Sequence, residues 1–336
     1  MMQTYQFSDF GLDAADIQTI GLPPLANDHI RVAIRAISLN YRDWLMVQGS
    51  YNPRLQKPFI PCSDASGEII AVGAEVGTWQ VGERVITHML PGWEAGPPPF
   101  DVHRHTLGGP APGVAASIVD LPANALVRLP NSLDWVTAAC LPVAGLTAWN
   151  ALRCLPKWRK PAWVLTLGSG GVSCFAVQIA KALGHQVIAT SSSEIKLSTM
   201  IELGADHGIN YVTHAAWDKA VLEFCPNGVD LVVEVGGSGT LDRSVNATRL
   251  GGAIALIGVL AATDASPNLT KALMKDLRLQ GILVGSRSRL EEFVAFVAQH
   301  HIKPLIAKHF HGFKALPAAF RYLSNLATPG KVVISL

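Results

Sequence analysis

A glycine-rich turn between a strand and a helix is the part of the sequence best suited to chemistry. Apolar residues predict a strand at 162–167 and a helix at 171–183, joined by the turn Gly168, Ser169, Gly170, Gly171, Val172 and Ser173. A helix that starts at such a turn presents backbone N–H groups to a pyrophosphate. The spacing therefore predicts a dinucleotide site, with a tight turn in a nucleotide-free α/β domain as the alternative.

Three serines and a lysine stand where an NAD site usually has an acidic residue. That Asp or Glu lies about 20 residues after the glycine turn and binds the ribose 2′-hydroxyl. Here the strand predicted at 186–190 is followed by Ser191, Ser192 and Ser193, with Lys196 one turn further on. Hydroxyl groups and a cation suit a 2′-phosphate, so the sequence predicts NADPH rather than NADH. The alternative is a polar loop in which Ser193 caps the next helix.

Alternating strands and helices must position this turn. The predicted strands are 162–167, 186–190, 207–211, 229–235, 252–258 and 278–284, and the helices are 171–183, 194–203, 214–224, 239–248 and 268–276. This alternation predicts a doubly wound parallel sheet of the α/β class. Ligands bind at the carboxyl edge of such a sheet, where the sequence places Tyr211, Val235, Gly236, Gly237, Ile257, Gly258, Gly285, Ser286 and Arg287. Alternatively, Val235 and Ile257 are core residues, and Arg287 meets solvent instead of a phosphate.

The segments on either side of this region have a different pattern. Residues 1–125 contain short apolar or alternating runs separated by Gly, Pro, Asn and Asp, at 30–37, 67–72, 84–87 and 116–121, which predict a β-rich domain. A Pro/Gly-rich loop without periodicity spans 88–114, and it is either functional or a surface insertion without a role. The remaining predictions are helices at 135–141, 145–152, 290–300 and 315–327 and a terminal strand at 331–336.

Composition excludes several classes of protein. A chain of 336 residues fits about two domains, and 49% hydrophobic with 15% charged residues allows a large core. A net charge of +2 without a long basic run argues against nucleic acid as the main partner. Five widely spaced cysteines without a CxxC pair indicate a reducing cytoplasm. The chain shows no apolar leader, and its longest apolar run, 253–262, is far below the ~18 residues of a membrane span, so no membrane association is expected.

Six motifs together resemble the medium-chain dehydrogenase/reductase superfamily over nearly the whole chain. They are Ser38-Leu39-Asn40-Tyr41-Arg42-Asp43, Ile60-Pro61-Cys62-Ser63-Asp64-Ala65-Ser66-Gly67, Val81-Gly82-Glu83-Arg84-Val85, Ala144-Gly145-Leu146-Thr147-Ala148-Trp149, the glycine turn 168–173, and Leu203-Gly204-Ala205-Asp206-His207. The chain is most similar to the zinc-free quinone-oxidoreductase-like branch and its NAD(P)-dependent alcohol-dehydrogenase-like members. The resemblance implies a GroES-like β-barrel catalytic domain at 1–125, a Rossmann NADPH-binding domain at 126–287, and a return to the first domain at 288–336. The active site is expected in the cleft between them.

The sequence departs from the zinc-containing members of the superfamily. Asn40 stands where they have a Cys, Ser63-Asp64-Ala65 stands at or near their Gly-His-Glu, and the loop 88–113 lacks the cysteines of a structural zinc lobe. His103 with His105, and His309 with His311, have the spacing of a chelating pair if extended, but neither pair has a third ligand. No metal is therefore expected.

The resemblance also assigns roles near the nicotinamide. Asn40, Tyr41 and Arg42 are candidate hydrogen-bond donors, and Thr147 lines the nicotinamide side. Tyr41 is either a proton donor or a packed aromatic residue. Asp43 and Asp64 are the carboxylates of the matching motifs, and a structural role in capping turns and orienting Arg42 is favoured over direct catalysis.

Without zinc, hydrogen-bond donors alone must stabilise the developing oxyanion. A quinone, enone or enal spreads this charge over a conjugated system, so we expect an NADPH-dependent reductase of a small conjugated carbonyl or quinone. The alternatives are a zinc-independent alcohol/ketone dehydrogenase and a non-catalytic NADPH-binding sensor. The family commonly pairs Rossmann sheets edge to edge, and 279–286 resembles an edge strand, so a homodimer is expected.

Overall fold

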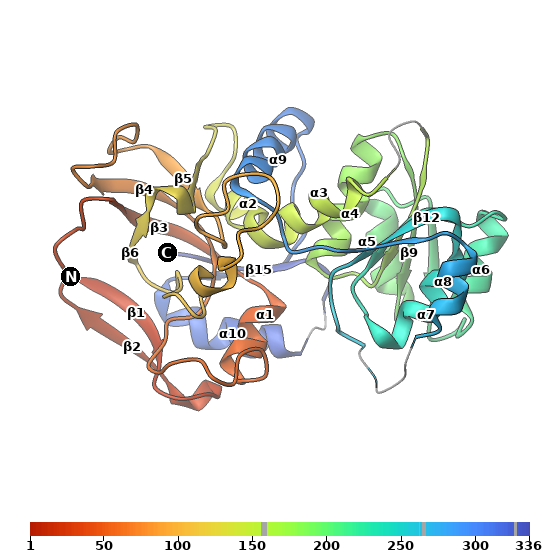
Figure 1. Ribbon diagram of the computed structural model, residues 1–336. Helices are drawn as coiled ribbons and strands as arrows, with labels where there is room; N and C mark the ends of the chain where they lie inside the picture. Colours follow the sequence, from red (N-terminus) through yellow and green to blue (C-terminus); the bar gives the residue numbers. More distant parts are fainter. Residues whose placement is uncertain (156–159, 262, 264–266, 326–327) are drawn as a thin grey trace. The chain divides into compact units, whose positions relative to one another are not determined.

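The computed structural model describes residues 1–336 apart from 156–159, 262, 264–266 and 326–327 (Figure 1). The described chain forms two compact units. Unit 1 consists of 1–146, 286–327 and 331–336, and unit 2 consists of 147–285 and 328–330.

Unit 1 is a β-structure that both ends of the chain help to build. Its large sheet has the order β14-β15-β3-β4-β5-β7, with β6 paired to β3, and a separate hairpin is formed by β1 and β2. All neighbouring strands are antiparallel except β14 and β15. The strands are β1 Met2–Phe7, β2 Ala15–Ile20, β3 His29–Leu39, β4 Asp64–Val72, β5 Arg84–Thr87, β6 Ile118–Pro122, β7 Leu126–Arg128, β14 Ile306–His311 and β15 Lys331–Ser335.

Short helices complete unit 1 and close its core. They are α1 Tyr41–Val47, α2 Trp135–Ala139, a π-helical turn Leu141–Gly145, α9 Arg287–His300 and α10 Leu316–Ser324, with single 3-10 turns at Leu12–Ala14, Val102–His105, Ala123–Ala125 and Phe313–Ala315. Phe7 from the first strand stacks on Phe59 with ring centroids 5.3 Å apart, and it also meets Phe320 of α10. These buried aromatic rings join the two ends of the chain in one hydrophobic core.

Unit 2 contains the predicted parallel sheet. The strand order is β10-β9-β8-β11-β12-β13, all parallel, so the order reverses between β8 and β11. This doubly wound topology confirms the predicted α/β class, and its ligand edge lies at the carboxyl ends of the strands. The elements are α3 Leu146–Leu152, β8 Trp163–Leu167, α4 Gly171–Ala182, β9 Gln186–Ser191, α5 Glu194–Glu202, β10 His207–Asn210, α6 Trp217–Phe224, β11 Val229–Glu234, α7 Ser238–Ala247, β12 Thr248–Leu256, α8 Leu269–Met274 and β13 Arg278–Gly281.

The compact units divide at 146/147 and 285/286, whereas the sequence suggested domain limits at 125/126 and 287/288. The segment after 125 is bound to the barrel strands. The hydroxyl of Ser66 in β4 donates to the carbonyl of Trp135 at 2.7 Å, and Arg84 of β5 donates to the carbonyl of Leu133 at 2.6 Å. These side-chain contacts, which composition does not reveal, assign 126–146 to unit 1.

Several local predictions need correction. The sixth strand, expected at 278–284, ends at Gly281, and the fifth, expected at 252–258, runs from Thr248 to Leu256. Helix α1 and the β1–β2 hairpin were not predicted. The helix predicted at 315–327 ends at Ser324, and its last two predicted residues lie outside the described part of the chain. Within the described residues, no helix is long and apolar enough to cross a membrane.

Candidate functional site

The glycine turn of unit 2 has the geometry of a phosphate site. Gly168 follows β8 with a φ of 70°, and Gly170 precedes α4 without a side-chain cap on the helix. A Cβ atom at either glycine would meet no other atom within 4 Å, so the space beside the turn is open. Ser173 fastens the first turn of α4 to β8, since its hydroxyl donates to the carbonyl of Leu167 at 2.7 Å. The N–H groups of this uncapped 12-residue helix suit a nicotinamide dinucleotide pyrophosphate.

The serine segment follows β9 directly. Ser191 is the buried last residue of that strand, and its hydroxyl donates to the hydroxyl of Ser169 in the glycine turn at 3.3 Å. Ser193 is the N-cap of α5 and accepts a hydrogen bond from the backbone N–H of Lys196 at 3.4 Å. The capping role considered for Ser193 is therefore present. Ser192 and Lys196 are both half-buried beside it. The nearby carboxylate of Glu194 accepts a hydrogen bond from the side chain of Asn210 at 2.8 Å.

A buried glutamate that the sequence analysis missed organises the loops after β11 and β12. The Glu234 carboxylate accepts hydrogen bonds from the N–H groups of Gly236 at 2.7 Å and Gly237 at 3.1 Å. It also accepts from the hydroxyls of Thr240, at 2.6 Å, and Ser244. The signal in the sequence is an acidic residue that ends an otherwise apolar strand.

The second loop is held by the backbone of the same glutamate. The N–H of Ile257 donates to the carbonyl of Glu234 at 2.9 Å, and that of Gly258 donates at 3.3 Å. A Cβ atom at Gly258 would lie 2.5 Å from the carbonyl oxygen of Val235, so this glycine is required by contact between the two loops. Val235 and Ile257 lie just beyond their strands and are half-buried, and Val235 packs against the hydrophobic core of unit 2.

The other residues predicted to contact the cofactor lie in both units. Tyr211 follows β10 and is 41% exposed at the carboxyl edge, and Thr147 is buried in α3. The expected strand-end position is wrong for Ser286 and Arg287, because β13 ends at Gly281 and both residues belong to unit 1.

The contacts of these two residues explain their placement. Ser286 caps α9, and the Arg287 guanidinium pairs with Glu94 at 2.6 Å and Glu291 at 2.7 Å. Gly285 is the last residue of this part of unit 2. The candidate contacts thus separate between the two units.

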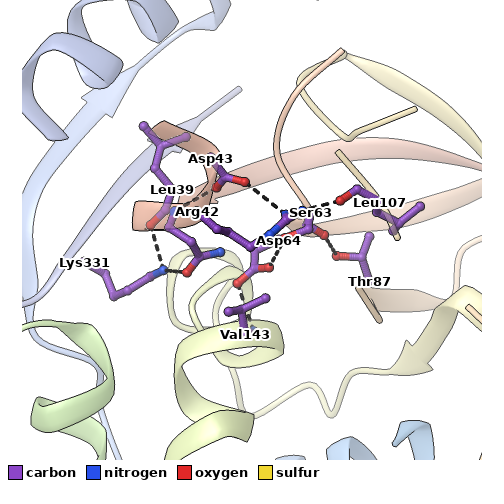
Figure 2. Close-up of polar contacts among 10 residues, drawn as sticks. Leu39, Arg42, Asp43, Ser63, Asp64, Thr87, Leu107, Val143 and Lys331 are labelled. Atoms are coloured by element: carbon purple, nitrogen blue, oxygen red, sulfur yellow. Dashed lines mark hydrogen bonds and ion pairs between the residues drawn. The ribbon is translucent and has the colours of Figure 1, made fainter. Parts of the chain in front are cut away.

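In unit 1, the motif 38–43 forms a turn from β3 into α1, and most of its polar side chains are buried. Figure 2 shows the polar contacts of this turn. Asn40 is the N-cap, and its backbone N–H donates to the Asp43 carboxylate at 2.8 Å. Arg42 donates to the other oxygen of Asp43 at 3.3 Å and to the carbonyl of Leu107 at 3.2 Å. Asp43 therefore makes the structural contacts expected for it, capping the turn and orienting Arg42. Tyr41, the first helical residue, is half-buried.

Asp64 is the second buried carboxylate of this cluster, at the start of β4. It accepts hydrogen bonds from the hydroxyl of Ser63 at 2.8 Å and from the N–H of Val143 in the π-helical turn at 3.0 Å (Figure 2). Burial raises the pKa of Asp64, and the nearby charge of Lys331 and the Asn40 side chain partly offset that rise. Asp64 thereby ties the motif 60–67 to the chain preceding the motif 144–149.

Lys331 is a functional candidate that the sequence analysis did not identify. It begins the C-terminal strand β15 and is only 4% exposed. Its ammonium group donates to the carbonyl of Leu39 at 2.7 Å and to Oδ1 of Asn40. On the other side of the Asn40 amide, Nδ2 is buried and makes no hydrogen bond, and the same holds for Nε and Nη2 of Arg42. The cluster therefore offers unused donors, as a site that binds an oxygen-bearing ligand requires.

Two known protein families match large parts of the chain. The Zinc-binding dehydrogenase family matches residues 171–299, and the Alcohol dehydrogenase GroES-like domain family matches residues 26–131. The chain belongs to the medium-chain dehydrogenase/reductase superfamily. It is an oxidoreductase of that superfamily, with a GroES-like domain and a Rossmann-type domain whose fold binds a nicotinamide cofactor.

Individual relatives extend over almost the entire chain. A zinc-type alcohol dehydrogenase-like protein of Schizosaccharomyces pombe is 37% identical over 97% of this chain and 96% of its own length. A probable quinone oxidoreductase of Leishmania amazonensis is 27% identical over 91% of this chain and 88% of its own. A solved structure of a candidate alcohol dehydrogenase from Sinorhizobium meliloti 1021 superposes with a TM-score of 0.92 at 38% identity, covering 100% of this chain and 98% of that one.

Within the described residues, the side chains that could bind a metal ion are not gathered in one place. Across the described ranges, no three His, Cys, Asp or Glu side chains lie close enough to hold a metal. His103 and His105 lie in a 3-10 turn instead of an extended segment. His309 and His311 are neighbours on β14 with ring centroids 4.3 Å apart, but His309 is hydrogen-bonded to Ser335 at 2.7 Å.

The buried Asp43 should make stability depend on pH. Desolvation raises its pKa from 3.8 to about 6, although Arg42 opposes the rise, so the folded state binds a proton between these pH values that the unfolded chain has released. The free energy of unfolding of the wild type, minus that of Asp43→Asn, is therefore expected to fall as the pH rises from 3.8 to about 6. Urea denaturation across this range measures it, with the exposed Asp13→Asn as control. A difference that rises with pH would show that Asp43 is stabilised as a carboxylate.

Proposed function

We propose that the protein is a zinc-independent, NADPH-dependent oxidoreductase that transfers hydride to a small conjugated carbonyl or quinone. The observation that carries this proposal is the buried amide nitrogen of Asn40, which makes no hydrogen bond. The resemblance described above implies that Asn40 takes the place of a zinc-binding cysteine. A neutral donor replaces a Lewis acid at this position. Such a donor provides enough stabilisation for an oxygen whose charge is shared with a conjugated system.

In this proposal, residues of unit 1 polarise the acceptor oxygen and provide the proton for the reduced product. When bound, the nicotinamide supplies the hydride. Asn40 Nδ2 donates a hydrogen bond to the acceptor oxygen, and the Tyr41 hydroxyl provides the proton that the reduced product needs. Asp43 and Asp64 keep the turn and the Arg42 side chain in place through the contacts described above. Both carboxylates thus act through structure, and neither is required as a nucleophile.

A zinc-independent alcohol/ketone dehydrogenase is the second candidate. The names of several relatives favour it, among them a zinc-type alcohol dehydrogenase-like protein at 37% identity and a solved NAD-dependent alcohol dehydrogenase at 29%. Simple ketones leave the full charge on one oxygen, which an amide and a phenol stabilise less well than a metal does. Reduction rates of 2-alkenals and quinones, compared with those of simple ketones, separate the two candidates.

Cofactor preference follows from the segment after β9. We expect Lys196→Ala to weaken NADPH binding by about tenfold to hundredfold, because a charge-assisted hydrogen bond to a phosphate contributes roughly 1.5–3 kcal/mol. NADH binding should stay almost unchanged, since NADH has no 2′-phosphate. Fluorescence titration measures both, and the exposed Lys219→Ala is the control. Equal weakening of both cofactors would mean that Lys196 does not contact the 2′-phosphate.

Kinetics should separate the roles of Asn40 and Tyr41 as hydrogen-bond donor and proton donor. Asn40→Ala is expected to lower kcat for the best acceptor by about 10²-fold, because one hydrogen-bond donor to the developing oxyanion is lost. Tyr41→Phe removes only the hydroxyl and should also lower kcat, while NADPH affinity stays at the wild-type value in both variants. Steady-state kinetics with quinone and enal acceptors provide the test. Full activity of Tyr41→Phe would assign the proton to water and leave Tyr41 as a wall of the pocket.

We also propose a homodimer formed through the edge of the parallel sheet. β13 lies at the end of the strand order, and the nearby α8 exposes Leu273 and Met274 by 77% and 74%. An unpaired edge strand next to exposed apolar side chains is unfavourable for a monomer. Light scattering at micromolar concentration should give about twice the chain mass of 35.8 kDa. A value equal to the mass of one chain would reject the dimer.

We also propose that the protein works in the cytoplasm on a small molecule. All five cysteines are free thiols, in agreement with a reducing cytoplasm. A small-molecule acceptor is the expected partner, whereas nucleic acid is not expected at a net charge of +2.

A further inference from the structure

Lys331 reaches the site from the other end of the chain. β15 pairs antiparallel with β3, and Val332 stands opposite Leu39 in this register. Lys331 consequently lies level with the turn that begins at Asn40. Both oxygens that its ammonium group contacts, those of Leu39 and of the Asn40 side chain, are uncharged, so two neutral groups solvate a buried cation. Burying a lysine in this way is costly, and a role in the site would account for it.

The lysine determines which way the Asn40 amide faces. An asparagine amide presents an acceptor oxygen on one side and an NH2 donor on the other, and a half rotation exchanges them. A lysine ammonium group has donors only, so the oxygen of Asn40 must face Lys331. Nδ2 is then directed away from the lysine.

We propose that Lys331 is a positioning residue for hydride transfer, which fixes the Asn40 amide so that Nδ2 faces the oxygen of the acceptor. The inference rests on the proposed function of Asn40. With Lys331 replaced by an apolar residue, the amide oxygen loses the ammonium group as a partner, and a rotated form that presents this oxygen to the acceptor oxygen becomes more populated. The donor is then lost for part of the time although Asn40 is still present.

Kinetics of single and double variants test this coupling. Lys331→Met should lower kcat by about tenfold to hundredfold and leave the KM for NADPH within twofold. In an Asn40→Ala background the same change should have almost no further effect, because the lysine acts through the amide. Lys331→Arg keeps donors and should restore part of the activity. Lys308→Met, an exposed lysine on the neighbouring strand β14, is the matched control and should behave as wild type.

Two outcomes would overturn the inference: an unchanged kcat in Lys331→Met, or losses from Lys331→Met and Asn40→Ala that multiply in the double variant. Thermal unfolding and NADPH titration establish that each variant is folded. If Lys331→Met does not fold, Lys331→Gln takes its place in the same comparison, since it removes the charge and keeps a similar size.

A spectroscopic measurement separates this inference from the proposed function. In protein labelled with 15N-asparagine, the side-chain amide signal of Asn40 is assigned by its loss in Asn40→Ala. Lys331→Met should shift this signal and speed its hydrogen exchange, and Lys308→Met should not. A wild type that reduces no acceptor but shows this shift would refute the function and retain the positioning role. An unchanged Asn40 signal in Lys331→Met would refute the positioning role whatever the activity.

Discussion

Four ionisable side chains, Arg42, Asp43, Asp64 and Lys331, are buried within one region of unit 1, and the site depends on the hydrogen bonds that compensate for their burial. Removing such groups from water costs several kcal/mol each unless hydrogen bonds and opposite charges replace the solvent. The replacement comes from segments far apart in the chain: the turn at 40–43, the start of β4, the carbonyl of Leu107 and the start of β15. The barrel strands and the C-terminal return hold these segments in register. The pairing of β15 with β3 places Lys331 beside Leu39 and Asn40.

In unit 2, the loops at the candidate site are held by one buried side chain. Glu234 is buried at the end of β11 and gathers the N–H groups and hydroxyls of the loop and helix that follow it. Its backbone carbonyl also receives the loop after β12. Both loops leave the carboxyl edge of the sheet next to the point where strand order reverses, which is the edge that binds ligands in this topology. In each unit, then, a buried carboxyl group fixes the backbone of the loops around the candidate site.

The sequence predicted the parts of the fold that local patterns determine. The strands and helices from β8 to α5 end within one residue of their predicted limits, because glycine turns and apolar runs define them. Helix α1 was missed since seven residues are too few to show an apolar period, although Asn40 and Asp43 have the spacing of a capping pair. The strand predicted at 278–284 was too long because its apolar residues continue into the segment leading to α9.

The sequence predicted two separate motifs of the candidate site but not the contacts that complete it. Asn40, Tyr41 and Asp43 belong to one contiguous stretch, and so does the glycine turn. Lys331 and Asn40 are 291 positions apart, and no spacing rule connects them. Arg287 was misplaced for the same reason, since its partner Glu94 lies in the Pro/Gly-rich loop and pairs with it across 193 positions. Sequence patterns identify candidate hydrogen-bond donors and turns. Contacts between residues far apart in the chain determine which of these donors are left without a hydrogen-bond partner.

The central claim is that hydride passes to the conjugated carbon of an acceptor with the help of neutral hydrogen-bond donors and without a metal. The most direct measurement uses NADPH deuterated at C4 of the nicotinamide, a 2-alkenal, and protein treated with a chelator. The account predicts a saturated product that carries the deuterium on the carbon β to the carbonyl group, formed at an undiminished rate. Deuterium on the carbonyl carbon of an allylic alcohol, or activity that disappears with the chelator and returns with zinc, would contradict it.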